Sequence, residues 1–111
     1  MKHEENAIHR AIVEHLRLRS KPNTIWFHPF NKAASAREGA FAKSMGVRAG
    51  VSDLILVRKG RPYALELKSA RGQLAVVQDT FLREWGAAGG KHAVAFGLDP
   101  ALWVLEEWGF L

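Results

Sequence analysis

Three charged residues fall within strand-like segments where hydrocarbon side chains are expected, and their spacing could assemble a metal site. The segments are GVSDLILV, which contains Asp53, and YALELKS, which contains Glu66 and Lys68. If Lys59-Gly60 forms a two-residue hairpin turn, Asp53 lies directly opposite Glu66. Lys68 then shares the face of Glu66, because residues two apart in a strand point the same way. The sequence therefore predicts two carboxylates and an amine converging on one patch.

This patch has the composition of a binding site for a divalent cation. Carboxylates that face each other across a strand pair repel, and burying them without a counter-charge is costly. Mg²⁺ or Mn²⁺ would remove this cost, so we expect Asp53 and Glu66 to bind one of them, with the backbone carbonyl of Leu67 as a third ligand. Lys68 would orient or deprotonate an attacking water and offset developing negative charge. Together these groups suit hydrolysis of a phosphodiester bond.

Two further residues are predicted to reach the same site from helices. Apolar residues recur at helical spacing from Glu4 to about Arg19, and on a helical wheel they centre near Glu5. Glu5 should therefore face the core, where it could bind a second metal or hold a metal-bound water. Glu4 remains the alternative to Glu5. Gln78, in a helix expected over residues 73–85, could hydrogen-bond the nucleophile or a phosphate oxygen.

Each candidate also has a purely structural alternative. Asp53 could brace a bend, and Glu66 with Lys68 could form the solvated face of an edge strand. The helix dipole favours an acidic residue near the start of a helix, which would account for Glu5 without any ligand role. Gln78 could be an ordinary surface residue. The common register of Asp53 and Glu66 is what favours function over these alternatives.

The histidines and tryptophans show no spacing typical of a catalytic or metal-binding motif. The histidines lack paired metal-binding spacing, HExxH included, so we expect them in the core, on the surface or beside phosphates. We expect the tryptophans to be core or interface aromatics. These residues are His3, His9, His15, His28 and His92, and Trp26, Trp85, Trp103 and Trp108.

Length and composition narrow the classes of protein that fit. A chain of 111 residues with 48% hydrophobic content predicts one domain over residues 1–111. The absence of cysteine excludes disulfides and thiolate zinc sites, and the net charge of +5 favours polyanionic partners such as nucleic acid. The polar start and the lack of an apolar run of about 20 residues predict a soluble cytoplasmic protein with no membrane partner.

Helix-like and strand-like segments alternate along the chain. This order predicts an α/β fold with a mixed β-sheet of about four strands flanked by helices. Asp99-Pro100 should supply the cap and first turn of the last helix. The expected helices cover residues 4–19, 73–85 and 101–108, with a loop and short helix within 31–45, and the expected strands cover 24–30, 51–57, 62–69 and 92–97.

Taken together, these motifs resemble the PD-(D/E)xK nuclease superfamily and, more narrowly, the VRR-NUC family, over most of the chain. The matching features are Glu5 with IHRAI behind it, MGVRAGVSDLIL containing Asp53, ALELK containing Glu66 and Lys68, and Gln78. Two departures stand out. Ser52 replaces the Pro that commonly precedes the aspartate, and His9 occupies a position often held by Gln.

The resemblance implies a restriction-endonuclease-like core and a metal-dependent DNA endonuclease. Small standalone members look like four-way (Holliday) junction resolvases, which act as homodimers so that two active sites cut symmetric strands. We therefore expect a Mg²⁺- or Mn²⁺-dependent nuclease acting on branched DNA as a homodimer. A nuclease or nickase without junction preference and a catalytically silent DNA-binding module are the alternatives.

A basic segment between the first strand and the hairpin is the candidate for phosphate contacts. Its alternative is a merely solvated loop. The residues are Asn31, Lys32, Arg37, Lys43 and Arg48.

Overall fold

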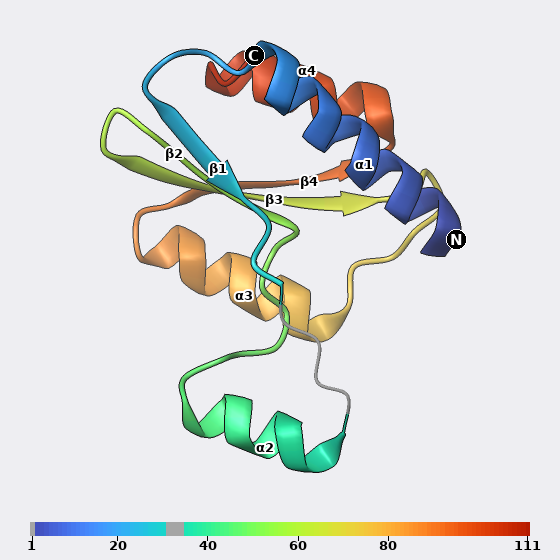
Figure 1. The fold of residues 1–111 in the computed structure, drawn as a ribbon, viewed down its shortest axis with the longest axis vertical. Helices are drawn as coiled ribbons and strands as arrows, with labels where there is room; N and C mark the ends of the chain where they lie inside the picture. The colour runs from blue at the N-terminus through green and yellow to red at the C-terminus, as the bar shows by residue number, and fades with distance from the viewer. Residues whose placement is uncertain (1, 31–34) are drawn as a thin grey trace.

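The computed structural model describes residues 2–30 and 35–111, and it confirms the expected α/β fold, a mixed sheet flanked by helices (Figure 1). Amphipathic helices and β-branched or aromatic strands alternate along the chain, as the sequence pattern predicts. The elements are α1 (Lys2–Arg19), β1 (Thr24–Phe27), α2 (Ala36–Ser44), β2 (Leu54–Arg58), β3 (Arg61–Lys68), α3 (Val76–Ala87), β4 (Lys91–Phe96) and α4 (Leu98–Trp108).

One end of each of the four strands lies at the same end of the sheet. Its order is β1-β2-β3-β4, with β1 and β2 antiparallel, β2 and β3 antiparallel, and β3 and β4 parallel. The carboxyl ends of β1, β3 and β4 therefore meet the amino end of β2. The backbone N–H of Gly97, directly after β4, donates to the carbonyl of Lys68 at 2.9 Å and closes this end of the sheet.

The central hairpin has the predicted register. Arg58 pairs with Arg61, and Leu54 pairs with Leu65. Positive φ angles of 50° and 75° at the two turn residues, Lys59 and Gly60, are those of a type I′ turn, whose twist matches the flanking strands. Counting one residue back from Leu54 brings Asp53 opposite Glu66, as the sequence predicts.

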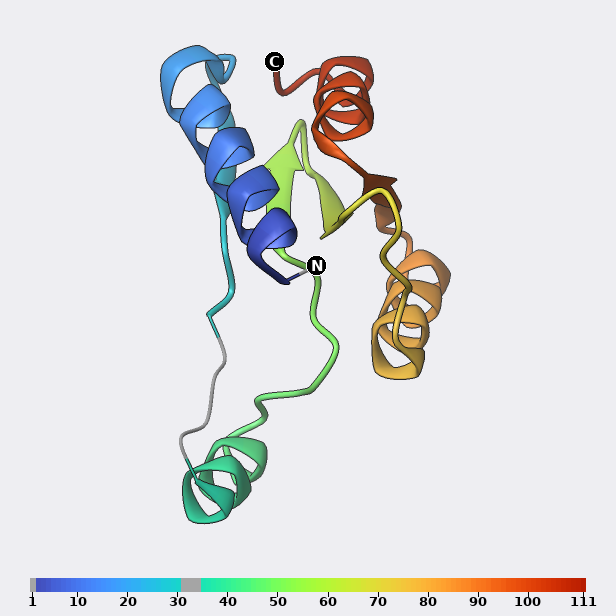
Figure 2. The ribbon, with the colours of Figure 1, turned by 90° about the vertical axis from the view of Figure 1, so that its right-hand side faces the viewer.

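Helices cover both faces of the sheet (Figures 1 and 2). Leu65 and Leu67 of β3 belong to the larger core, which α1 and α4 complete, whereas Ala64 packs in a smaller cluster with Phe81 and Leu82 of α3. Glu66 and Lys68 alternate with the leucines and therefore share the α3 face of Ala64. Among the described helices, none combines the length and apolarity needed to cross a membrane.

The largest differences in extent from the prediction fall in two strands and two helices. β1 stops at Phe27 because Pro29 has no N–H to donate to a ladder, and β2 starts at Leu54. At the start of β2 the Asp53 side chain, and not a backbone carbonyl, accepts the N–H of Leu67. Similarly, α3 begins at Val76, three residues later than expected, and Gly97 takes the N-cap position of α4, so the cap prediction for Asp99 is wrong.

The short helix α2 lies away from the sheet (Figure 2). It spans nine residues and buries none of them. Its N-terminus is capped by the Ser35 hydroxyl, which accepts the backbone N–H of Glu38 at 3.2 Å, and Gly46, with a φ of 93°, follows its end. A loop followed by a helix that stops at Gly46 is what the sequence predicts.

The connection that delivers Asp53 packs tightly against α3. Gly50 has a φ of 82°, and a Cβ at this position would overlap the carbonyl oxygen of Val77 in α3. Glycine is therefore required here both by conformation and by space. Nearby Ser52 is buried, and its hydroxyl has no hydrogen-bond partner within residues 2–30 and 35–111, so the loop is held by packing and not by this side chain.

Replacing Gly50 tests whether this contact matters. We expect Gly50→Ala to lower the free energy of unfolding by more than about 2 kcal/mol, since backbone strain and overlap with Val77 add together. Gly60→Ala is the matched control, because its φ is also positive but open space surrounds it, and it should lose only about 1 kcal/mol. Urea denaturation measures both, and equal losses would contradict the proposed contact.

Candidate active site

Asp53 is held at the sheet end by contacts to three parts of the chain. Its Oδ2 accepts the backbone N–H of Leu67 at 2.7 Å, and its Oδ1 lies 3.9 Å from Nδ1 of His9 on α1. Its backbone carbonyl accepts a hydrogen bond from Nδ1 of His28, just after β1, at 2.6 Å. A bracing role and a ligand role are therefore compatible, because the backbone is anchored while the carboxylate remains partly exposed.

Glu66 and Lys68 are buried charged residues on an inner strand. Only 3% of Glu66 and 7% of Lys68 is exposed, and β3 has a hydrogen-bonded neighbour on each side. Nζ of Lys68 lies 3.7 Å from Oε2 of Glu66. This geometry contradicts the alternative that the two residues form a solvated face of an edge strand.

The raised pKa of Glu66 reflects a buried site with two carboxylates and little positive charge to balance them. Burial raises the pKa of Glu66 to about 8; the negative charge of Asp53 acts in the same direction, while Lys68 opposes the rise. One ammonium therefore does not compensate both acids. A site of this kind fits a divalent cation, which would favour the charged form of both carboxylates.

Gln78 contacts the site through Glu66. Its Nε2 donates to Oε2 of Glu66 at 2.9 Å, and its Oε1 accepts the backbone N–H of Ala75, the residue before α3, at 2.9 Å. Because the Ala75 N–H needs an acceptor, its bond to Oε1 turns the amide nitrogen of Gln78 toward Glu66. Gln78 is thus no ordinary surface residue, and these contacts make it a positioning residue for Glu66. Its contact with a nucleophile or phosphate stays a prediction.

Glu5 lies at the same end of the sheet and is the better candidate of the two helical acids. It is half-buried, whereas Glu4 is exposed. Its Oε2 would lie 3.2 Å from a Cβ on Gly72, and the side chain of Lys68 borders the same point. Its role as a metal ligand remains a prediction.

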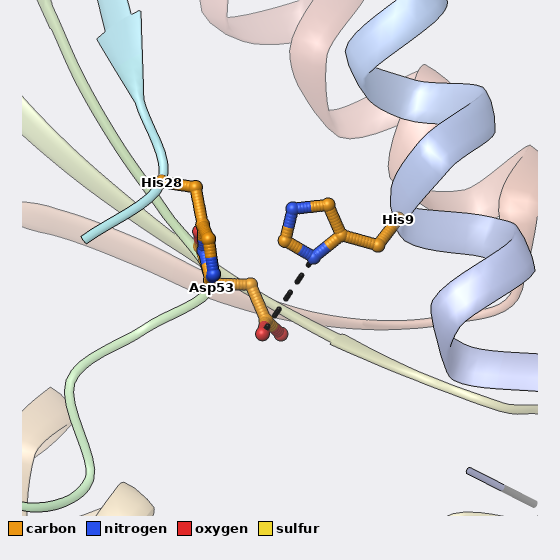
Figure 3. Close-up of side chains that lie close together, drawn as sticks. All are labelled: His9, His28 and Asp53. Atoms are coloured by element: carbon orange, nitrogen blue, oxygen red, sulfur yellow. Dashed lines mark hydrogen bonds and ion pairs between the residues drawn. The ribbon is translucent and has the colours of Figure 1, made fainter. Parts of the chain in front are cut away.

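Two histidines beside Asp53 were not foreseen as a group (Figure 3). The rings of His9 and His28 meet edge to face with centroids 4.6 Å apart, and one ring nitrogen of each lies within 4.8 Å of a carboxylate oxygen of Asp53 and of the other. Burial lowers the pKa of His9, although Asp53 raises it and His28 lowers it further. The neutral imidazole is the form that binds metals.

Little in the sequence predicts this cluster. The sequence does not predict that His9 and His28 meet, because the two come from different elements and share no local spacing. One signal was available: His9 follows Glu5 by one helical turn, so both lie on the same face of α1.

The basic segment divides into three parts. Arg37 and Lys43 are exposed on α2, whereas Arg48 lies 3.3 Å from Oε1 of Glu84 and stacks 5.2 Å from the Phe81 ring centroid, so it ties the connection to α3. Asn31 and Lys32 lie outside the described residues. A hollow of about 710 Å³ separates α2 from the sheet end, and its lining includes His28 and Lys43.

A solved structure has a similar overall fold. No protein-family model and no curated protein sequence matches this chain. The structure of a "VRR_NUC domain protein", however, superposes with a TM-score of 0.78 at 20% sequence identity, covering 95% of this chain and 87% of that one. This chain has the VRR-NUC fold. At this identity the similarity establishes the fold, which agrees with the resemblance that the motifs carry.

The pKa of Glu66 predicts how the metal-free chain responds to pH. Because the pKa is raised from 4.5 to about 8, the folded chain holds a proton that the unfolded chain has lost between these values. The free energy of unfolding should therefore fall as the pH rises through this window, by up to about 1.4 kcal/mol per pH unit, and level off above it. Urea denaturation in the presence of a chelator measures this slope.

Glu66→Gln should remove that slope and make the metal-free chain more stable than the unsubstituted chain at pH 8. Glu107→Gln is the control, because Glu107 is exposed on α4, and it should retain the slope. Parallel pH profiles for both variants would contradict the assigned environment of Glu66.

Proposed function

We propose that this chain is a metal-dependent DNA endonuclease that hydrolyses phosphodiester bonds. The observation that carries the proposal is the buried carboxylate of Glu66 facing that of Asp53, with the ammonium of Lys68 beside them. An acidic pair of this kind destabilises the metal-free fold, so a structural role alone does not explain it. The VRR-NUC fold adds support, because it is the fold expected from the family that these motifs resemble.

Mg²⁺ or Mn²⁺ is the proposed cofactor. Asp53 and Glu66 would hold it, with the carbonyl of Leu67 as a further oxygen ligand, and Glu5 would bind a second ion or a water at the first. All four residues lie at the same end of the sheet. A bound ion supplies Lewis-acid chemistry, since it polarises the phosphate and makes a nearby water more acidic.

The protein groups would divide the remaining work of hydrolysis. In the reaction, the oxygen of a water forms a bond to phosphorus, and the bond from phosphorus to the leaving ester oxygen breaks. Lys68 would orient that water and offset the negative charge on the phosphate, a role favoured by its burial beside an acid. Gln78 would keep Glu66 in position through its hydrogen bond.

DNA would approach from the side of α2. The net charge is +5, and α2 presents Arg37 and Lys43 beyond the hollow that leads to His28. The amino-terminal ends of α3 and α4 follow β3 and β4, and their dipoles add positive potential at the same end of the sheet. These features suit a backbone contacted by charge and shape, without direct reading of bases.

A homodimer acting on branched DNA is the finer form of the proposal. A nine-residue helix that buries nothing is marginally stable alone, yet Phe41 of α2 is 68% exposed and Met45, at the C-cap of α2, is 69% exposed. A second copy packed on this helix would cover these side chains and set two active sites in a symmetric pair. Two sites related in this way would suit the two symmetric strands of a four-way junction.

Cleavage of a labelled four-way junction in Mg²⁺ tests the proposal. We expect junction nicking by the unsubstituted chain, with slower cutting of linear duplex of the same sequence. Asp53→Asn and Glu66→Gln should each reduce the rate at least about 100-fold, because a metal ligand contributes several kcal/mol to the transition state. Glu107→Gln should cleave normally.

Junction binding measured in a chelator separates the possible failures. Binding without cleavage by the unsubstituted chain in either Mg²⁺ or Mn²⁺ would favour the silent DNA-binding module and contradict the nuclease. Cleavage that persists in both acidic-site variants would contradict the assignment of the site. Equal rates on junction and duplex would leave a nuclease without junction preference.

A further inference from the structure

We infer that His9, His28 and Asp53 form a site for a divalent transition-metal ion, with two imidazole nitrogens and one carboxylate as protein ligands. The three donor atoms lie within 4.8 Å of one another, a separation that small side-chain movements can close around one ion. The inference shares Asp53 with the proposed function, but it concerns which ion binds and through which residues.

Three separate elements converge to make this group (Figure 3). His9 projects from α1, His28 directly follows β1, and Asp53 directly precedes β2. β1 and β2 are hydrogen-bonded neighbours with Phe27 opposite Ile55, so the register of the sheet brings His28 and Asp53 together. The packing of Ile12 and Leu16 against the main core fixes α1 and, with it, the side from which His9 arrives.

The hydrogen bond of His28 sets the ring tautomer that metal binding needs. A backbone carbonyl only accepts, so Nδ1 of His28 carries the hydrogen in its 2.6 Å bond to the carbonyl of Asp53. The lone pair is then on Nε2. Metal-binding histidines nearly always donate their other ring N–H to a carbonyl or carboxylate, which sets the tautomer and orients the ring.

The donor set selects the class of ion. Mg²⁺ prefers an all-oxygen shell, as Mn²⁺ does, whereas imidazole favours later transition ions such as Co²⁺, Ni²⁺ or Zn²⁺. Asp53 is shared by the histidine pair and the acidic site. Its Oδ1 faces His9, and its negative charge acts on Glu66. The two histidines therefore give this end of the sheet an affinity for transition metals that a purely carboxylate site would lack.

Titration of the untagged full-length chain with Co²⁺, followed by visible absorption and calorimetry, tests the inference without any DNA. We expect Co²⁺ to bind at least tenfold more tightly than Mg²⁺ and to produce a visible ligand-field band. His9→Gln and His28→Gln should each weaken Co²⁺ binding at least tenfold and reduce the band. His15→Gln is the matched control, since His15 lies on the same helix but contacts Arg19 instead, and it should bind as the unsubstituted chain does.

A second measurement protects the test against misfolded variants. Zn²⁺ added to the unsubstituted chain should shift the ¹⁵N resonances of the His9 and His28 rings and leave those of His15 unchanged. Shifts absent from both rings, or Co²⁺ affinity that survives both substitutions in folded protein, would overturn the inference. The unsubstituted chain could cleave no DNA and yet bind Co²⁺ in a way that the histidine substitutions abolish. That result would uphold the metal-site inference and contradict the proposed function.

Discussion

The hydrogen bond from the Leu67 N–H to the Asp53 carboxylate is the interaction on which this end of the molecule depends. At 2.7 Å it takes a donor that the strand ladder would otherwise use, so β2 can begin only after Asp53. It also holds the Asp53 side chain beside the residue that follows Glu66. One bond thus ends the pairing of two strands and brings two acids together, at a cost that a divalent cation would offset.

The rest of the fold keeps that arrangement rigid. β3 lies between β2 and β4, and its leucines are buried under α1 and α4, so the opposite face of the strand has a fixed orientation. From that face Gln78 of α3 reaches Glu66, while α3 itself sits against the backbone of Gly50. The acidic pair is therefore held from both layers, which is the preorganisation that a metal site requires.

Local rules account for what the sequence predicted well. A Lys-Gly turn with two positive φ angles and the two-residue period of strands together fix the register of the hairpin, so the meeting of Asp53 and Glu66 could be foreseen. The same period separated the leucines of β3 from its charged residues. The apolar stripe of α1 favours Glu5 over Glu4 without deciding between them, and in the structure Glu5 is half-buried while Glu4 is exposed.

Tertiary contacts account for what could not be foreseen. His9 and His28 meet only because α1 packs over the sheet beside the end of β1, and Arg48 pairs with Glu84 only because the connection folds back onto α3. Neither pair has a sequence spacing that a local rule recognises. The start of α4 was misplaced for a smaller reason: Gly97, with a φ of 118°, turns the chain directly from β4 into the helix, so Asp99 falls inside the first turn.

The central claim is that Asp53 and Glu66 bind one divalent cation between them. Anomalous diffraction from crystals of the full chain soaked in Mn²⁺ tests it most directly, because the signal locates the ion without reference to activity. The account predicts a peak within about 2.6 Å of carboxylate oxygens from both residues. Mn²⁺ bound elsewhere on the chain, with no peak between these two acids, would contradict it.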